Sequence, residues 1–331
     1  MVLFARNVDT PEQVAELVRE MQSVARDAGH DLPLLVAVDQ EGGRVARLRE
    51  PWTLWPPLRA VGRAGSEELA RRMGEGLAVE LKACGIRCDF APVLDVDTNP
   101  RNPVIGDRSF GDDPEQVGRL GAAMIRGLQE QGVIASAKHF PGHGDTDVDS
   151  HLELPAVDHS LSRLRDVELR PFRKAVEAQV ATVMTAHVLV RELDDALPAT
   201  LSPHVIRPLL REELKYVGVV VSDDLEMKAV ADRWTPAARA VLAAQAGCDV
   251  LIFSKSQDAQ VEAIEALVRA VEAEQIAWQE MDDVCARIRR LKERFLLPYV
   301  DPSPKQARIA AGVGENGAIA RELADRGGIP A

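Results

Sequence analysis

The sequence predicts an α/β fold of the (β/α)8 TIM-barrel type, although only seven of the eight strands can be counted in it. Short apolar segments alternate with amphipathic ones, which is typical of a parallel sheet covered by helices on both faces. Several apolar segments end in charged residues or histidines, and this is where β/α barrels carry their functional groups. The 331 residues are enough for one large domain.

The strands are recognised as short apolar runs that stop at polar residues. The runs before Asp39, Asp95, Lys138 and Asp223 all have this form, which is typical of a buried strand that leads into a polar loop. In chain order, strands are expected at residues 3–5, 34–38, 88–94, 133–137, 181–185, 217–221 and 249–253.

The helices are recognised by their first residues and by apolar side chains at helical spacing. Thr10-Pro11 combines a threonine cap with proline at the first helical position, and Asp113-Pro114 has the same form. The helix after Thr10 places apolar residues on one face as far as Val24. In chain order, helices are expected to begin at 10, to cover 66–84, to begin at 113, and to cover 160–177, 202–215 and 237–246.

The chain is expected to form a single barrel domain over residues 1–297, followed by a C-terminal extension at 298–331. Pro298, Pro302 and Pro304 interrupt the preceding helix. About thirty residues without an apolar strand cannot build a core of their own. The extension is therefore expected to pack outside the barrel or to be partly mobile.

Composition and charge exclude several classes of partner. The net charge is −12 and no basic block stands out, so nucleic acid and anionic membranes are poor partners. No apolar segment reaches the roughly 18 residues of a membrane span, and no secretory signal is recognised. Cys84, Cys88, Cys248 and Cys285 lack a zinc-site spacing, so reduced thiols buried in the core or at helix ends, in a cytoplasmic protein, are expected.

A metal site is not expected either, and neither is a cofactor. His139 and His143 are separated by Pro141-Gly142, so they cannot share a helix face as the histidines of a zinc H-E-x-x-H pair do. The aspartates at 145, 147 and 149 match only the start of a calcium loop, because position six is serine and position twelve is alanine.

The strand ends should meet at one mouth, because the carboxyl ends of parallel barrel strands lie at the same end of the barrel. Carboxylates, imidazoles and cations without a reactive cysteine or phosphate-binding glycine loop favour hydrolysis or proton transfer on a neutral, hydroxyl-rich substrate. The residues expected there are Asp39, Arg44 or Arg47, Asp95, Lys138, His139, His151, His187 and Asp223.

One stretch carries a family resemblance. Residues 138–151, Lys-His-Phe-Pro-Gly-His-Gly-Asp-Thr-Asp-Val-Asp-Ser-His, closely resemble the K-H-F-P-G-H-G-x-T-x-x-D-S-H signature of NagZ-type β-N-acetylglucosaminidases, which belong to family three of the glycoside hydrolases. Further matches to this family follow in chain order at residues 38–48, 90–96, 105–110, 184–187 and 221–227.

The resemblance implies a retaining exo-glycosidase that removes terminal β-linked N-acetylglucosamine from peptidoglycan turnover fragments, with or without an attached peptide, in cell-wall recycling. It places the nucleophile on Asp223 and the proton donor on His151, which Asp149 would orient. The implied sugar-binding residues are Asp39, Arg47, Arg108, Lys138 and His139. A small sugar or muropeptide would be the only partner of a monomer that uses no metal.

The physical chemistry of these residues agrees with such roles. Asp149 and His151 share one side if the backbone between them is extended, so the carboxylate can orient the imidazole. Asp224 would point away from Asp223, and a hydrogen bond to loop backbone or a helix cap is its alternative role. For His151 the alternative is a loop-anchoring hydrogen bond. Two other functions stay open: a phosphorylase that uses phosphate in place of water, and a non-catalytic sugar-binding barrel.

Relatives of the implied family begin with an additional strand and helix, so the first strand-helix unit of the barrel is the one expected to be missing. The sequence starts inside the segment that follows this unit. A true start upstream of Met1 is the simplest hypothesis, and an opening between the first and last strands is the expected consequence.

Overall fold

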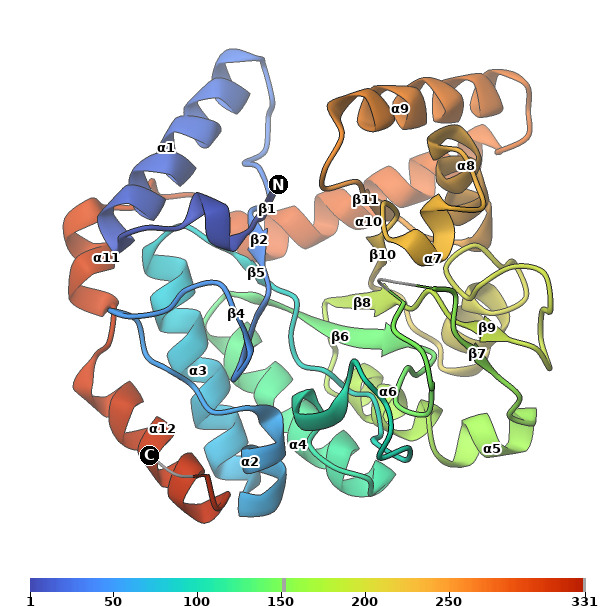
Figure 1. Cartoon of the computed structure of the whole chain (residues 1–331). Helices are drawn as coiled ribbons and strands as arrows, with labels where there is room; N and C mark the ends of the chain where they lie inside the picture. The colour runs from blue at the N-terminus through green and yellow to red at the C-terminus, as the bar shows by residue number, and fades with distance from the viewer. Residues whose placement is uncertain (151–152, 330–331) are drawn as a thin grey trace.

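The computed structural model describes residues 1–150 and 153–329 and shows a parallel sheet surrounded by helices (Figure 1). Within these residues the sheet has seven strands, and their order in space follows their order in the chain, as in a β/α barrel. The strands are β1 (Val2–Leu3), β2 (Ala37–Val38), β5 (Cys88–Asp89), β6 (Ile134–Phe140), β8 (Thr182–Thr185), β10 (Val219–Asp224) and β11 (Val250–Ile252).

Helices connect these strands, and their first residues are capped as predicted. The Thr10 hydroxyl accepts a hydrogen bond from the Gln13 N–H (3.1 Å), and the Asp113 carboxylate accepts one from the Glu115 N–H (3.0 Å). The helices are α1 (Pro11–Asp27), α2 (Leu58–Ala64), α3 (Glu67–Ala83), α4 (Pro114–Glu130), α5 (Leu161–Asp166), α6 (Leu169–Glu177), α7 (Lys228–Ala231), α8 (Pro236–Ala246), α9 (Gln257–Glu272), α10 (Trp278–Leu296), α11 (Pro304–Ala310) and α12 (Gly314–Arg326). Among the helices that the structure describes, none is long and apolar enough to cross a membrane.

The sheet has β1 at one edge and β11 at the other. Each inner strand pairs with two neighbours; Cys88 of β5, for example, lies opposite Ala37 of β2 and Ile134 of β6. No strand pairing joins β11 to β1 in residues 1–150 and 153–329. The predicted parallel α/β architecture is therefore confirmed, with the expected opening between the first and last strands, but a closed (β/α)8 barrel is not.

Two strands differ in length from the prediction. β6 continues through Lys138 and His139 to Phe140, so polar residues expected in a loop belong to the strand. The third strand is regular only at Cys88–Asp89, and the chain then meets β6 again where Val93 lies opposite Lys138. Pro92 explains the break because it cannot donate a backbone hydrogen bond.

Several smaller elements also depart from the prediction. The helix expected at 160–177 is divided into α5 and α6, and the one expected at 202–215 is a π-helical segment, η3 (Ile206–Glu213). Two short strand pairs were not predicted, namely β3 (Gln40–Gly42) with β4 (Val45–Ala46) and β7 (Ala156–Val157) with β9 (Leu189–Val190). Two short 3-10 turns, η1 (Ala5–Asn7) and η2 (Gly106–Arg108), complete the described elements.

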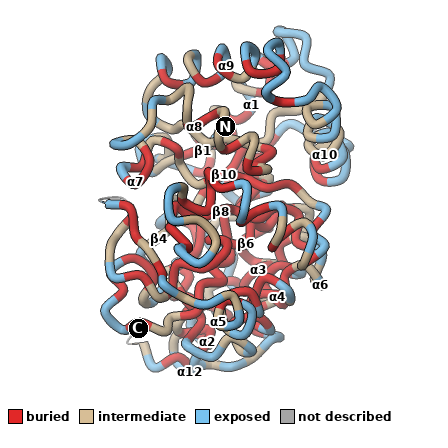
Figure 2. Tube along the Cα trace, turned by 90° about the vertical axis from the view of Figure 1, so that its right-hand side faces the viewer, coloured by how far each residue is buried: buried red, intermediate tan, exposed pale blue. Residues whose placement is uncertain are grey.

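The core runs through the sheet, where the chain is buried along β6, β8 and β10, and the outer helices carry the exposed positions (Figure 2). The C-terminal helices α11 and α12 pack on α1, α2 and α3. Ala307, Ile319 and Leu323 are buried in the same apolar cluster as the strands. Most of the predicted extension therefore packs outside the sheet. Three cysteines are buried as predicted, whereas Cys285 is exposed on α10.

Candidate active site

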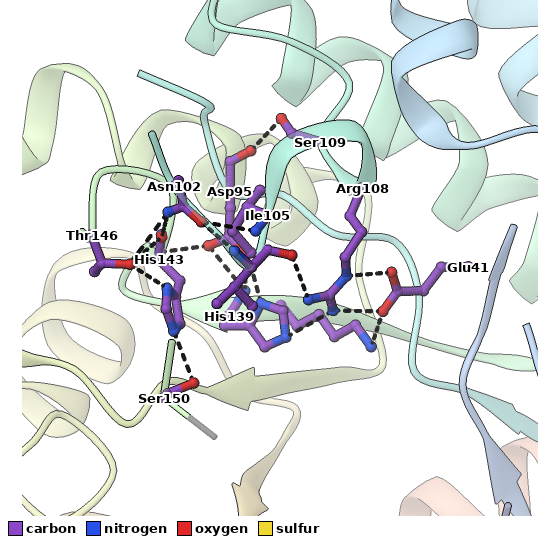
Figure 3. Close-up of polar contacts among 12 residues, drawn as sticks. Glu41, Asp95, Asn102, Ile105, Arg108, Ser109, His139, His143, Thr146 and Ser150 are labelled. Carbon is purple, nitrogen blue, oxygen red and sulfur yellow. Dashed lines mark hydrogen bonds and ion pairs between the residues drawn. The ribbon is translucent and has the colours of Figure 1, made fainter. Parts of the chain in front are cut away.

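The predicted polar residues lie where the sheet strands end. Asp39 follows β2. Lys138 and His139 are among the last three residues of β6, and Asp223 and Asp224 end β10. Because the strands are parallel, their carboxyl ends lie at the same end of the sheet. Figure 3 shows the part of this region that is held by Glu41, Arg108, His139 and His143.

A cluster of buried ion pairs joins four of the five predicted sugar-binding residues, namely Asp39, Arg47, Arg108 and Lys138. Glu41, which was not predicted from the sequence, connects them. Lys138 Nζ lies 2.9 Å from Asp39 Oδ1 and 2.6 Å from Glu41 Oε1. Arg108 binds Glu41 through two bonds of 2.8 Å, and Arg47 Nη2 lies 3.1 Å from Asp39 Oδ2. Two carboxylates thus fix three cations before any ligand binds.

Glu41 is the centre of this cluster and is only 1% exposed. Burial would raise the pKa of its carboxyl, but the charges of Arg108 and Lys138 outweigh burial and lower it. Burial likewise works to lower the pKa of Lys138, and Asp39 and Glu41 raise it above its ordinary value. Glu41 and Lys138 are therefore both charged at neutral pH. The sequence did offer an indication that Glu41 belongs to the site, because Glu41 stands two residues after Asp39.

The fifth predicted sugar-binding residue, His139, contacts Arg108 of this cluster, and Asp95 orients its ring. His139 Nδ1 lies 2.7 Å from Asp95 Oδ2, and its Nε2 lies 3.5 Å from Arg108 Nη2. Because the carboxylate accepts, Nδ1 carries the hydrogen of this bond, and Nε2 faces Arg108. Burial acts to raise the pKa of Asp95, and the interaction with His139 outweighs it, so the pKa is lowered.

Asp223 sits at the end of β10 and is half-buried. In the described residues its carboxylate accepts one hydrogen bond, from the Asp224 N–H at 2.7 Å. Burial would raise the pKa of Asp223, yet the charges of His187 and His139, this hydrogen bond and Lys138 together lower it. Asp223 is therefore an ionised carboxylate near the predicted sugar-binding residues.

Asp224 is held differently, as predicted. Its Oδ1 accepts from the Glu226 N–H (3.0 Å), and its Oδ2 accepts from the Ser254 hydroxyl. His187, buried after β8, donates from Nε2 to the Asp224 carbonyl (3.0 Å) and contacts the Thr200 hydroxyl through Nδ1 (2.9 Å). His187, which was predicted to lie at the mouth, thus ends its strand with buried hydrogen bonds.

Asp149, which was predicted to orient the proton donor, lies in the segment that follows β6. Asp149 is partly exposed, and its carbonyl accepts a hydrogen bond from the Glu153 N–H (3.0 Å). His151 lies outside the described residues. The residue between them, Ser150, is buried and bonded on two sides: its Oγ lies 3.0 Å from His143 Nε2, and its carbonyl accepts from the Ala229 N–H at 3.3 Å.

His143 makes the folded chain sensitive to mild acid. Burial lowers its pKa from the ordinary 6.5 to about 4, although the Asp95 charge opposes this shift. The unfolded state therefore binds a proton that the folded state rejects, and the free energy of unfolding rises with pH between 4 and 6.5, by roughly 3 kcal/mol over the window.

We expect His143→Gln to lose this acid sensitivity. The variant lacks the buried imidazole, so its Tm deficit relative to wild type should shrink as the pH is lowered from about 7 to about 5. Thermal unfolding followed by circular dichroism at several pH values measures this difference. A deficit that stays constant over the range would contradict the assignment of His143 as a buried neutral group.

The described residues show no group of three or more His, Cys, Asp or Glu side chains placed to hold a metal ion. The described residues of the candidate site carry charged and hydrogen-bonding side chains. Such a set can bind hydroxyl groups and move protons, and its ionised carboxylate can act as a nucleophile.

Comparison with known families shows which family this chain belongs to. The model of the glycosyl hydrolase family 3 N-terminal domain matches residues 1–291. The chain belongs to glycosyl hydrolase family 3. The resemblance of residues 138–151 to a signature of this family is thereby confirmed.

Individual members of glycosyl hydrolase family 3 are similar in sequence and in structure. A β-hexosaminidase A of Pseudoalteromonas piscicida is 35% identical, over 98% of this chain and 57% of its own length. A solved family 3 β-N-acetylglucosaminidase of Paenibacillus sp. has a TM-score of 0.91 at 41% identity, over 98% of this chain and 62% of that one. NagZ of Neisseria gonorrhoeae in complex with N-trifluoroacetyl-D-glucosamine has a TM-score of 0.77 at 31% identity, over 98% and 90%. The chain thus spans less than two thirds of the first two of these relatives.

Proposed function

We propose that this chain is a retaining exo-β-N-acetylglucosaminidase, which removes terminal β-linked N-acetylglucosamine. The observation that carries the proposal is the ionised Asp223 carboxylate at the end of β10, on the same side of the sheet as the Lys138 cluster. Attack on an anomeric carbon needs a fixed, deprotonated carboxylate. The similarity to family 3 N-acetylglucosaminidases supports the identity of the sugar.

The proposed reaction has two displacement steps. Asp223 attacks the anomeric carbon while a general acid protonates the leaving glycosidic oxygen, and a covalent glycosyl-enzyme forms. The same acid, now a base, then removes a proton from water, which attacks the anomeric carbon and releases the sugar with retained configuration. We assign this acid/base role to His151, oriented by Asp149, because an imidazole with an ordinary pKa near 6.5 can both donate and accept a proton near neutrality.

The cluster around Lys138 is proposed to bind the terminal sugar. The members that would contact the sugar are Asp39, Arg47, Arg108, Lys138 and His139. Hydrogen bonds from charged donors to hydroxyl groups are strong. Glu41 and Asp95 hold Lys138, Arg108 and His139 in place before the substrate arrives. Little side-chain freedom is therefore lost when the sugar binds.

We further propose that the substrates are cytoplasmic peptidoglycan turnover fragments, in which N-acetylglucosamine is linked to anhydro-N-acetylmuramic acid with or without a peptide. The match of residues 138–151 to the NagZ-type signature supports this choice. The enzyme would act as a monomer and would need neither a metal nor a cofactor.

A trapping experiment tests the proposal. A ring-fluorinated N-acetylglucosaminyl fluoride, which forms a glycosyl-enzyme faster than water can hydrolyse it, should label the chain once. Mass spectrometry of the digest should find the label on the peptide that contains Asp223. Label on another carboxylate, or none with an active enzyme, contradicts the assignment. A parallel assay with phosphate separates hydrolysis, which yields free sugar, from phosphorolysis, which yields the sugar 1-phosphate.

A further inference from the structure

A buried histidine outside the proposed chemistry connects the two halves of the candidate site. His143 is only 2% exposed, and its backbone N–H donates to Asp95 Oδ1 at 2.6 Å. The other oxygen of Asp95 holds His139, a proposed sugar-binding residue, at 2.7 Å. Through Asp95, the position of His143 is therefore tied to the sugar-binding side of the site.

The ring of His143 lies between two hydroxyl groups. Nδ1 is 2.8 Å from Thr146 Oγ1, and Nε2 is 3.0 Å from Ser150 Oγ (Figure 3). A hydroxyl can donate or accept, so a neutral imidazole can satisfy both partners at once. Asn102 donates to the His143 carbonyl (2.8 Å) and to Thr146 Oγ1 (3.3 Å), which fixes the ring from a second loop.

Ser150 is the far end of this connection, and it is held from both sides. Its hydroxyl is bonded to His143, while its carbonyl accepts from Ala229 in α7, which follows the loop after the Asp223 strand. Ser150 thus connects the segment after β6 to α7, and its sequence neighbour Asp149 is part of the proposed acid/base pair.

We propose that His143 is a positioning residue for proton transfer, which acts by holding Ser150 and, through it, the neighbouring Asp149 of the proposed acid/base pair. This inference rests on the proposed function. The His143–Ser150 hydrogen bond would add nothing to the affinity for the sugar, because that is set by the Lys138 cluster. It would matter for substrates whose leaving group needs a proton, since a displaced acid cannot supply one in time.

The dependence on the leaving group separates positioning from simple stability. Ser150→Ala removes the hydroxyl and leaves the His143 ring in place. We expect kcat/KM to fall by about 10-fold to 100-fold for a disaccharide or alkyl glycoside, and by less than about 3-fold for a dinitrophenyl glycoside, whose leaving group departs without protonation. His143→Gln should show the same pattern, and Ser150→Thr, which keeps a hydroxyl, should restore most of the loss.

Azide supplies a second readout that loss of stability would not change. Azide attacks the glycosyl-enzyme without the help of a base, so it should raise kcat of Ser150→Ala on the dinitrophenyl glycoside and give the β-glycosyl azide. Ser136→Ala is the matched control. It makes the same change at a buried β6 hydroxyl that has no hydrogen-bond partner in the described residues, and it should behave like wild type.

The outcomes are distinct. Equal losses on both classes of substrate, or no loss on either, overturn the positioning role while the proposed function stands. A wild-type enzyme that cleaves neither class of N-acetylglucosaminide overturns the proposed function, and the positioning role with it. Wild-type activity combined with a loss confined to poor leaving groups supports both.

Discussion

Asp223→Asn should lower kcat/KM for aryl β-N-acetylglucosaminides by at least about 10³-fold. The amide keeps the size of the carboxylate and can still accept the hydrogen bond from the Asp224 N–H. It has no charge with which to attack an anomeric carbon or to stabilise the positive charge that develops there. Steady-state kinetics with a chromogenic glycoside measure the loss, and unchanged circular dichroism shows that the fold is retained.

The neighbouring residue provides the matched control. Asp224→Asn makes the same change one position along, in a carboxylate that is occupied with the Glu226 N–H and the Ser254 hydroxyl. We expect its effect on kcat/KM to stay within about 10-fold, because both oxygens of this side chain are occupied with groups of neighbouring loops. Comparable losses in the two variants would remove the distinction between these aspartates.

Anion rescue of the smaller variant adds a stereochemical test. In Asp223→Ala, azide can occupy the space of the carboxylate and attack the anomeric carbon directly. A single displacement inverts the configuration, so the product should be the α-glycosyl azide, whereas variants impaired in acid/base function should give the β-anomer after two displacements. A β-azide from Asp223→Ala would contradict the role of Asp223 as nucleophile.

The positions of the functional strand ends could be predicted from the sequence because they follow from a general rule. An apolar run that ends in a titratable residue marks a buried strand, and parallel strands bring such ends to one side. On this ground alone Asp39 and Asp223 were placed at strand ends, where the structure has them, whereas Lys138 lies within the longer strand β6. The rule states only where a strand end lies, and it does not state which partner each side chain selects.

The sequence did not predict which charged side chains pair with one another. Either Arg44 or Arg47 could have reached the mouth, and the structure pairs Arg47 with Asp39 while Arg44 binds Asp107 at the exposed surface. Glu41 was missed because its role depends on Arg108, which is far along the chain and comes from a short 3-10 turn with no apolar pattern. Contacts of this kind are set by tertiary packing and leave no local periodicity.

The aromatic residues show the same limit of sequence reasoning, because the sequence does not give the orientation of a ring. Trp52 and Trp55 follow soon after the family-like stretch at residues 38–48, and both are almost completely buried in the main apolar cluster. Phe140 is fully buried and packs edge-on against Phe172 at 5.2 Å between ring centroids. The structure therefore assigns these three side chains to packing. An aromatic residue near a motif in the sequence does not reveal which way its ring points.

Lys138→Met should have the second largest effect, on both stability and activity. The substitution removes the ammonium group that lies 2.9 Å from Asp39 and 2.6 Å from Glu41, and methionine fills a similar volume. Breaking a buried ion pair from one side leaves a charge without its partner, so we expect a loss of about 3 kcal/mol or more in the free energy of unfolding. We expect kcat/KM to fall by about 100-fold, because the sugar loses a charged donor.

A double-mutant cycle with Glu41→Gln isolates the pair within the cluster. Each single variant leaves one buried charge under-compensated, whereas the double variant removes both, so it should be less destabilised than the sum of the two by at least about 1 kcal/mol. Urea unfolding of the four proteins measures the coupling, with Lys82→Met at an exposed helix position as the control for the substitution itself. Additive losses would mean that Lys138 and Glu41 are stabilised independently. In that case the preordering of the sugar-binding cations would have to come from Asp39 alone, and Arg108, which contacts Glu41 and not Asp39, would no longer be linked to Lys138.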